Sequence, residues 1–246
     1  MSIKWIYLAK RNPATDHMEF RKRWREHSAL ASQFAATMGK HFTGVRQCAK
    51  VQRADLPPEL VNDYDGVALL WLRSMEDMRG VWTDPSTTGT MIPDEPRVFS
   101  TQVLKFSLFC QEWAEFDRGE GAFALLAFVK RKAGTSRADF IARWRDQHAP
   151  MLLKVPAADR LVRRYRQNHV FMDPPPGYDF DGVAELWFDS VDDALALLRD
   201  PDYRASIVGD LATFTEPSAA VTLLIEINHR KVDPSAPATG PLVLSR

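Results

Sequence analysis

The strongest constraint on the fold of this chain is an internal repeat that covers most of its 246 residues. The stretch KRNPATDHMEFRKRWRE from Lys10 aligns without a gap with KRKAGTSRADFIARWRD from Lys130, and this alignment places Trp24 on Trp144. Further along, DYDGVALLWLRSMEDM from Asp63 matches DFDGVAELWFDSVDDA in the second half at nine of sixteen positions. A repeat of this length predicts two copies of one structural unit that pack against each other.

Each copy contains the same order of expected elements. An apolar, β-rich run (residues 3–9 and 123–129) is followed by a helix with an apolar stripe, two strands, a second helix and a last strand. This order is that of the ferredoxin-like fold, in which both helices cover one face of an antiparallel sheet. We therefore expect an α+β protein with two tandem ferredoxin-like domains, packed sheet to sheet as an internal pseudo-dimeric α+β barrel.

The expected domains are residues 1–115 and 120–230. The connecting segment AEFDRGEG begins at Ala114, and residues 231–246 form a proline-containing tail. We expect this tail to be loosely ordered or to lie over a neighbouring surface.

The composition limits the classes of partner. The 32 basic residues balance the 32 acidic ones, so no overall charge favours a nucleic acid or a membrane surface. No apolar run is long enough for a membrane span, and the N-terminal stretch becomes polar too soon for a signal peptide, so we expect a cytoplasmic protein. We expect a small hydrophobic or aromatic molecule as the partner. A homodimer, in which two such chains associate, is also compatible with the sequence.

Three segments of the second half carry a family resemblance. WRDQHAP from Trp144, YRQNHV from Tyr165 and YDFDGVAELWFDS from Tyr178 resemble the EthD domain of the dimeric α+β barrel superfamily. The first half resembles a second, diverged EthD domain. The resemblance implies enzymes of several classes, since relatives act in ether degradation, in dehydration and ring-forming steps of polyketide pathways, in cofactor-free oxidation of quinol-like compounds and in muconolactone isomerisation.

The resemblance also implies site residues. The histidine of the His-Ala-Pro signature falls on His148, and the polar strand of the family falls on Gln167, Asn168 and His169. In the first copy Ser28 replaces this histidine and Leu30 replaces the proline, while His27 lies one residue early. Because a helix turns by about 100° per residue, His27 is not expected to point where His148 points. We therefore expect the first half to be a structural partner and the second half to be active.

Each candidate also has a structural interpretation. His148 could cap the helix end ahead of Pro150 rather than transfer protons. Glu185 alternates with Val183 and Trp187 in its strand, whereas the first copy has Leu69 at that position. A carboxylate there is either an acid, a base or an orienting group for imidazole, or it forms a salt bridge with a strand arginine.

No nucleotide-binding loop, serine-nucleophile elbow or HExxH motif occurs, and the histidines and the two distant cysteines form no metal-site pattern. We therefore expect a cofactor-independent lyase or dehydratase that acts on an aromatic, polyketide-like or hydrophobic carbonyl compound. The expected catalytic residues are His148, Glu185 and His169, and the expected substrate-binding residues are Trp144, Gln167, Asn168 and Trp187. The alternatives are an isomerase or quinol-type monooxygenase on the same scaffold, a non-catalytic binding protein for a hydrophobic intermediate, and a haem-binding variant.

Overall fold

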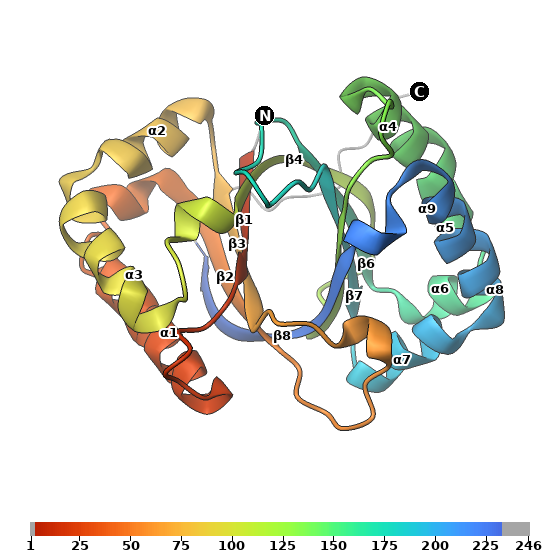
Figure 1. Cartoon of the computed structure of the whole chain (residues 1–246), viewed down its shortest axis with the longest axis horizontal. Helices are drawn as coiled ribbons and strands as arrows, with labels where there is room; N and C mark the ends of the chain where they lie inside the picture. The colour runs from red at the N-terminus through yellow and green to blue at the C-terminus, as the bar shows by residue number, and fades with distance from the viewer. Residues whose placement is uncertain (1–2, 233–246) are drawn as a thin grey trace.

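A closed eight-stranded barrel forms the centre of the protein in a computed structural model that describes residues 3–232 (Figure 1). The strand order is β1-β3-β2-β8-β5-β7-β6-β4, and β4 returns to β1. The helices of the first half lie on one side of the barrel and those of the second half on the opposite side.

The strands are β1 (Ile3–Ala9), β2 (Phe42–Lys50), β3 (Gly66–Leu72), β4 (Ser107–Asp117), β5 (Phe123–Val129), β6 (Arg164–Val170), β7 (Gly182–Phe188) and β8 (Val221–Val232). The α-helices are α1 (His17–Ser32), α2 (Met75–Thr83), α3 (Ile92–Val98), α4 (Arg137–Arg143), α5 (Ala149–Leu152), α6 (Pro156–Leu161), α7 (Val191–Arg199), α8 (Pro201–Tyr203) and α9 (Gly209–Phe214). Wider π-helical turns occupy Thr87–Met91, Trp144–His148 and Arg204–Val208, and 3-10 turns occupy Met38–His41, Pro58–Leu60, Val103–Phe106 and Pro217–Ala219.

Each half forms the expected ferredoxin-like sheet, β4-β1-β3-β2 in the first and β8-β5-β7-β6 in the second. The two sheets are also joined at their edges, because β2 pairs with β8 and β4 pairs with β6, both antiparallel. The predicted α+β barrel is therefore confirmed. Edge pairing satisfies the backbone groups that two stacked open sheets would leave exposed.

Two strands run a few residues past the expected ends of the domains. The predicted connecting segment from Ala114 is still strand, since Ala114, Phe116 and Asp117 lie opposite residues of β6. The predicted tail begins inside β8, where Lys231 lies opposite Val45 of β2. Both extensions have one cause: pairing across the two halves lengthens β4 and β8, and neither copy alone contains that signal. The rest of the tail lies outside the described residues.

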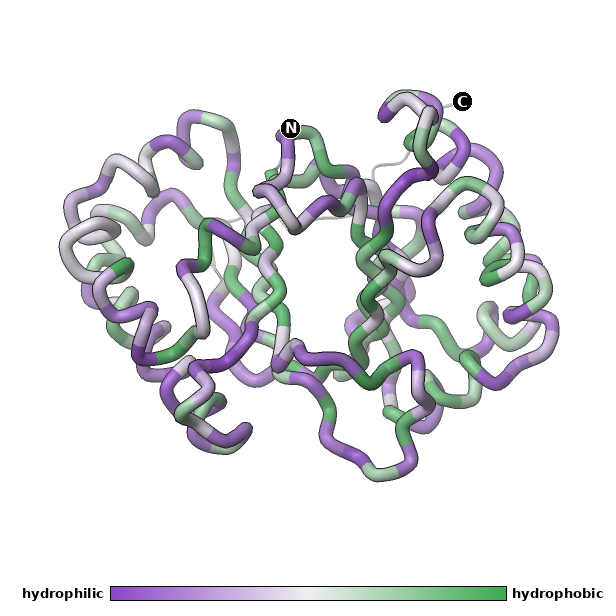
Figure 2. Tube along the Cα trace, in the orientation of Figure 1, coloured by the Kyte–Doolittle hydropathy of each residue, from purple (hydrophilic) through white to green (hydrophobic). Residues whose placement is uncertain are grey.

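Alternation along the strands separates two environments. In β1, Trp5 and Tyr7 face the helices, whereas Lys4 faces the barrel interior and contacts strands of the other half. Figure 2 shows apolar residues concentrated along the strands and polar residues on the outer turns of the helices. A functional group on a strand therefore points either to a helix-covered face or into the barrel.

The repeated Asp-Gly pairs have a structural role. A Cβ atom at Gly66 would lie 2.7 Å from the Trp24 ring, and one at Gly182 would lie 2.2 Å from the Trp144 ring. Only glycine lets each buried tryptophan approach the sheet this closely. The preceding aspartates, Asp65 and Asp181, accept hydrogen bonds from the backbone N–H groups of Arg11 and Arg131, which follow the first strand of each copy.

Candidate functional site

Both halves contain a buried histidine paired with an aspartate. In the first half, His27 Nδ1 lies 2.8 Å from Asp94 Oδ2. In the second half, His148 Nδ1 lies 2.9 Å from Asp210 Oδ2. The imidazole has therefore not been lost from the first copy, although the sequences align Ser28 with His148.

A π-helical turn explains how residues at unequal spacing reach equivalent places. His27 follows Trp24 by three residues within the regular helix α1, whereas His148 follows Trp144 by four residues within the π-turn Trp144–His148. A π-turn contains one more residue per turn than an α-helix, so it returns His148 to the face that His27 occupies. The expectation that His27 cannot take the direction of His148 was therefore wrong, because it assumed two regular helices.

Pro150 gives the π-turn a local cause. A proline in a regular helix lacks the N–H donor and clashes with the carbonyl four residues earlier, and a wider turn relieves both defects. The helix continues through Pro150 to Leu152, so His148 does not cap a helix end. The first copy has Leu30 at this position and stays α-helical.

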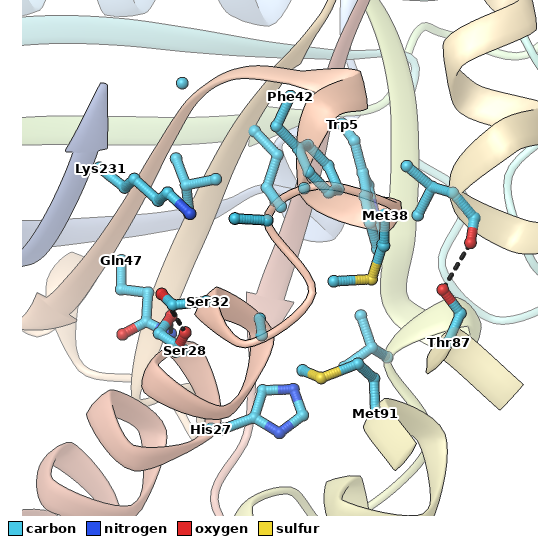
Figure 3. Close-up of a pocket in the computed structure, with 18 of the residues that line it drawn as sticks. Trp5, His27, Ser28, Ser32, Met38, Phe42, Gln47, Thr87, Met91 and Lys231 are labelled. Atoms are coloured by element: carbon cyan, nitrogen blue, oxygen red, sulfur yellow. Dashed lines mark hydrogen bonds between the residues drawn. The ribbon is translucent and has the colours of Figure 1, made fainter. Parts of the chain in front are cut away.

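A cavity of about 360 Å³ lies in the first half, between its helices and the outer face of its sheet (Figure 3). Its walls are mostly apolar, and its polar lining includes His27, Ser28, Gln47 and Glu95. In Figure 3 the His27 ring lies at one end of the cavity, beside Met91. This volume is within the range typical of small-molecule sites. The sequence, in contrast, predicts the active pocket in the second half.

A chain of hydrogen bonds fixes the orientation of the His27 ring. Arg97 binds Asp94 with two nitrogens, at 2.8 Å and 3.1 Å, and Asp94 in turn binds His27 Nδ1. The guanidinium lowers the pKa of Asp94, so the aspartate is ionised at neutral pH. Burial lowers the pKa of His27, while the bond to Asp94 opposes that shift. A neutral His27 that donates from Nδ1 presents the lone pair of Nε2, which has no hydrogen-bond partner among the described residues.

Glu95 is a second ionisable group of this cavity. One carboxylate oxygen accepts a hydrogen bond from the backbone N–H of Val103 at 3.0 Å, and the side chain forms no ion pair within the described part of the chain. Burial raises the pKa of Glu95 to about 6. Tyr7 lines the same cavity, and its pKa is raised by burial. The site thus combines a base with a carboxyl group that is protonated at mildly acidic pH.

The predicted residues of the second half separate into two groups. On the helix-covered face, Gln167 donates to the backbone oxygen of Trp144 at 3.2 Å and lies 2.8 Å from His169 Nε2. His169 packs against the Trp144 ring, and burial lowers its pKa to about 4. Burial also lowers the pKa of His148.

The other three predicted residues lie inside the barrel. Glu185 accepts hydrogen bonds from Asn168 at 2.7 Å and from the Trp187 indole at 3.0 Å, and it forms a buried ion pair with Lys4. The sheet therefore separates Glu185 from His148, and the two do not share one site. Of the two interpretations of Glu185, the salt bridge between halves is the one observed, with a lysine rather than an arginine as partner.

Sequence reasoning missed Asp94, Asp210 and Glu95. The two aspartates were detectable, because each follows the third strand of its copy at the same distance, but no local motif marks them. Within residues 3–232, no group of three or more histidine, cysteine, aspartate or glutamate side chains could hold a metal ion, and no helix is long and apolar enough to cross a membrane.

The closed barrel of two ferredoxin-like halves, with a helix-covered cavity beside its sheet, defines a dimeric α+β barrel protein contained in a single chain. The EthD domain model matches residues 12–102 and again residues 132–218, and the chain belongs to this family. No curated protein matches the chain.

Solved structures share the fold at low sequence identity. An anthrone oxidase-like protein aligns with a TM-score of 0.63 and 11% identity over 97% of this chain and 95% of that chain. A proposed monooxygenase from Fusobacterium nucleatum gives 0.58 and 7% identity over 94% of both chains. A chlorite dismutase variant from Candidatus Nitrospira defluvii gives 0.51 and 10% identity over 92% of both. At these identities the similarity establishes the fold alone.

Proposed function

We propose that the protein is a cofactor-independent oxidase or monooxygenase of an aromatic hydroxyl or carbonyl compound, and that its site is the cavity of the first half. One observation carries the proposal: the imidazole of His27, oriented by Asp94, lies in the wall of an apolar cavity with Nε2 unpaired. An imidazole held in this way can remove a proton from a phenol or from the carbon next to an aromatic ketone.

The similarity to structures named for oxidase and monooxygenase activity supports oxidation over the dehydration that we expected from the sequence. The resulting carbanion or phenolate is electron-rich and reacts with dioxygen. For a CH₂ group converted to C=O, one dioxygen is consumed and one water is released. Glu95, when protonated, can donate to the substrate oxygen on which negative charge develops.

The test compares His27→Ala with His148→Ala, because each variant removes one imidazole from equivalent surroundings. Oxygen uptake and product formation are measured with anthrone as the probe substrate. We expect His27→Ala to lower kcat by about 10²- to 10⁴-fold, and His148→Ala to change it by less than about threefold.

Full activity of His27→Ala would overturn the assignment, and loss of activity in His148→Ala alone would move the site to the second half. Turnover without oxygen uptake would identify a lyase or isomerase instead. A Soret absorption band in the purified protein would contradict the cofactor-independent reaction.

A further inference from the structure

The second half of the chain contributes to the cavity of the first half. Strand β8 pairs with β2, and this register places His229 opposite Gln47 and Lys231 opposite Val45. All four residues line the cavity. Figure 3 shows the Lys231 side chain extending from β8 with its ammonium group directed toward the cavity. Arg230, which lies between the two, points to the other face of the sheet and pairs with Glu120.

These side chains make one wall of the cavity basic. Lys231 and His229 of β8 line this wall, Lys40 lines the cavity from the turn Met38–His41, and none of the three has a carboxylate partner among residues 3–232. Burial lowers the pKa of His229, so the proposal relies on Lys231. The lining holds two lysines, Lys40 and Lys231, against one acidic residue, Glu95, whose pKa of about 6 leaves it largely ionised at neutral pH.

The second half has no such basic wall. Trp113 of β4 lies opposite Gln167, as His229 lies opposite Gln47. Phe116 lies opposite Tyr165, which is the repeat counterpart of Val45. Because the two halves share their backbone arrangement, the basic groups are a property of this cavity and not of the fold.

We propose that the ligand of the first-half cavity is an aromatic compound that carries an anionic group such as a carboxylate, and that Lys231 binds this group. The inference rests on the cavity proposed above as the active site and names its substrate class. The apolar walls take the ring system, the basic wall takes the anion, and His27 remains for the reacting part of the molecule. The tandem arrangement then has a functional reason, since the second copy supplies the strand that binds the anion.

The experiment measures binding of two probes by calorimetry at about pH 8, where lysine is charged and histidine is largely neutral. Naphthoate carries a carboxylate, and naphthamide is its uncharged amide of similar shape. We expect naphthoate to bind about 10-fold or more tightly than naphthamide to the wild-type protein, with a preference that declines as salt is added. Lys231→Met should reduce the preference to less than about threefold, while Lys154→Met, a matched change in the second half, should leave it unchanged.

Equal binding of both probes to the wild type would overturn the inference, as would an equal loss for both probes in Lys231→Met, because that result indicates lost packing. His27→Ala should keep the preference for naphthoate, so the inference can hold even if the catalytic assignment fails. If neither probe binds, the proposed aromatic site and its substrate class fail together.

Discussion

At the scale of single residues, burial decides how the ionisable groups of the cavity behave. His27 and Glu95 both lie under the helices of the first half, but burial acts on them in opposite directions because it disfavours whichever form is charged. The pKa of the histidine is lowered and that of the glutamate is raised to about 6. Burial therefore favours the neutral form of both groups.

Glu95→Gln should stabilise the protein at alkaline pH. The pKa of Glu95 rises from 4.5 to about 6 on folding, so the folded state holds its proton more strongly and loses stability as pH increases through this window. By about pH 8 the ionised carboxylate should destabilise the fold by up to about 2 kcal/mol, which glutamine removes. Urea denaturation at about pH 4 and about pH 8 should show a gain at the higher pH alone.

The control for this measurement is Glu59→Gln, which alters an exposed glutamate and should show no comparable difference between the two pH values. A gain of equal size at both pH values would point to better packing by glutamine and would contradict the role of the charge.

At the scale of secondary-structure elements, one π-turn changes which residue of a helix reaches the aspartate. The family signature around His148 and the diverged copy around His27 differ in spacing from their tryptophans by one residue. The presence of Pro150 in one copy and Leu30 in the other matches the presence and absence of the π-turn. A sequence alignment pairs residues by their position along the chain, whereas the structure pairs residues whose side chains point in the same direction from the helix.

Pro150→Leu should convert the π-turn into a regular helix, because the requirement for the wider turn is removed. His148 would then rotate by about 100° away from Asp210, to the place that Ser28 holds beside Gln47 in the first copy. Because the bond to Asp210 opposes the lowering of the His148 pKa by burial, loss of that bond should lower the pKa further, as measured by NMR titration of the ring protons. An unchanged titration would show that the proline does not cause the turn.

A triple variant tests whether the spacing between the tryptophan and the histidine decides which residue reaches Asp210. The triple change Gln147→His, His148→Ser and Pro150→Leu rebuilds the spacing of the first copy within the second. We expect the imidazole at position 147 to bind Asp210 and to titrate as His148 does in the wild type.

At the scale of the whole molecule, an asymmetric ion pair joins the two halves across the barrel. Lys4 of β1 contacts Glu185 of β7 and lies 2.6 Å from Glu112 of β4. The repeat counterparts of Lys4 and Glu185 are Ala124 and Leu69, so the equivalent crossing is apolar. The ion pair forms only when a first half, which carries Lys4, faces a second half, which carries Glu185. Two first halves or two second halves would each lack one member of the pair, so the pair favours association of unlike halves.

Removing Lys4 alone should be more harmful than removing Lys4 and Glu185 together. Lys4→Met leaves the buried carboxylate of Glu185 without its cation, with an expected loss of about 3–5 kcal/mol in the free energy of unfolding, whereas Glu185→Leu leaves Lys4 paired with Glu112 and should cost less. The double variant copies the apolar crossing and should lose far less than the sum of the single losses. Urea denaturation of the four proteins measures the coupling, and simple additivity would contradict it.

The sequence alone determined the architecture. The repeat, the order of apolar runs and the glycine before each third strand specify two ferredoxin-like units, because each signal is local and appears twice. Alternation, which is a property of the backbone, places Asn168 and His169 on opposite sides of their strand, and the structure has them there. Edge pairing between the halves was not readable, because the length of β4 and β8 depends on strands far away in the sequence.

The tertiary structure alone decided where the candidate site lies. The sequence favoured the second half on the presence of His148 and Glu185, but the sheet separates these two side chains, and a π-turn makes His27 the geometric equal of His148. The cavity is formed by side chains from α1, α3, β2 and β8, which meet only when the barrel closes. A local sequence pattern predicts which way a side chain points from its own helix or strand. Only the packing of helices and strands decides which of these side chains meet in one cavity.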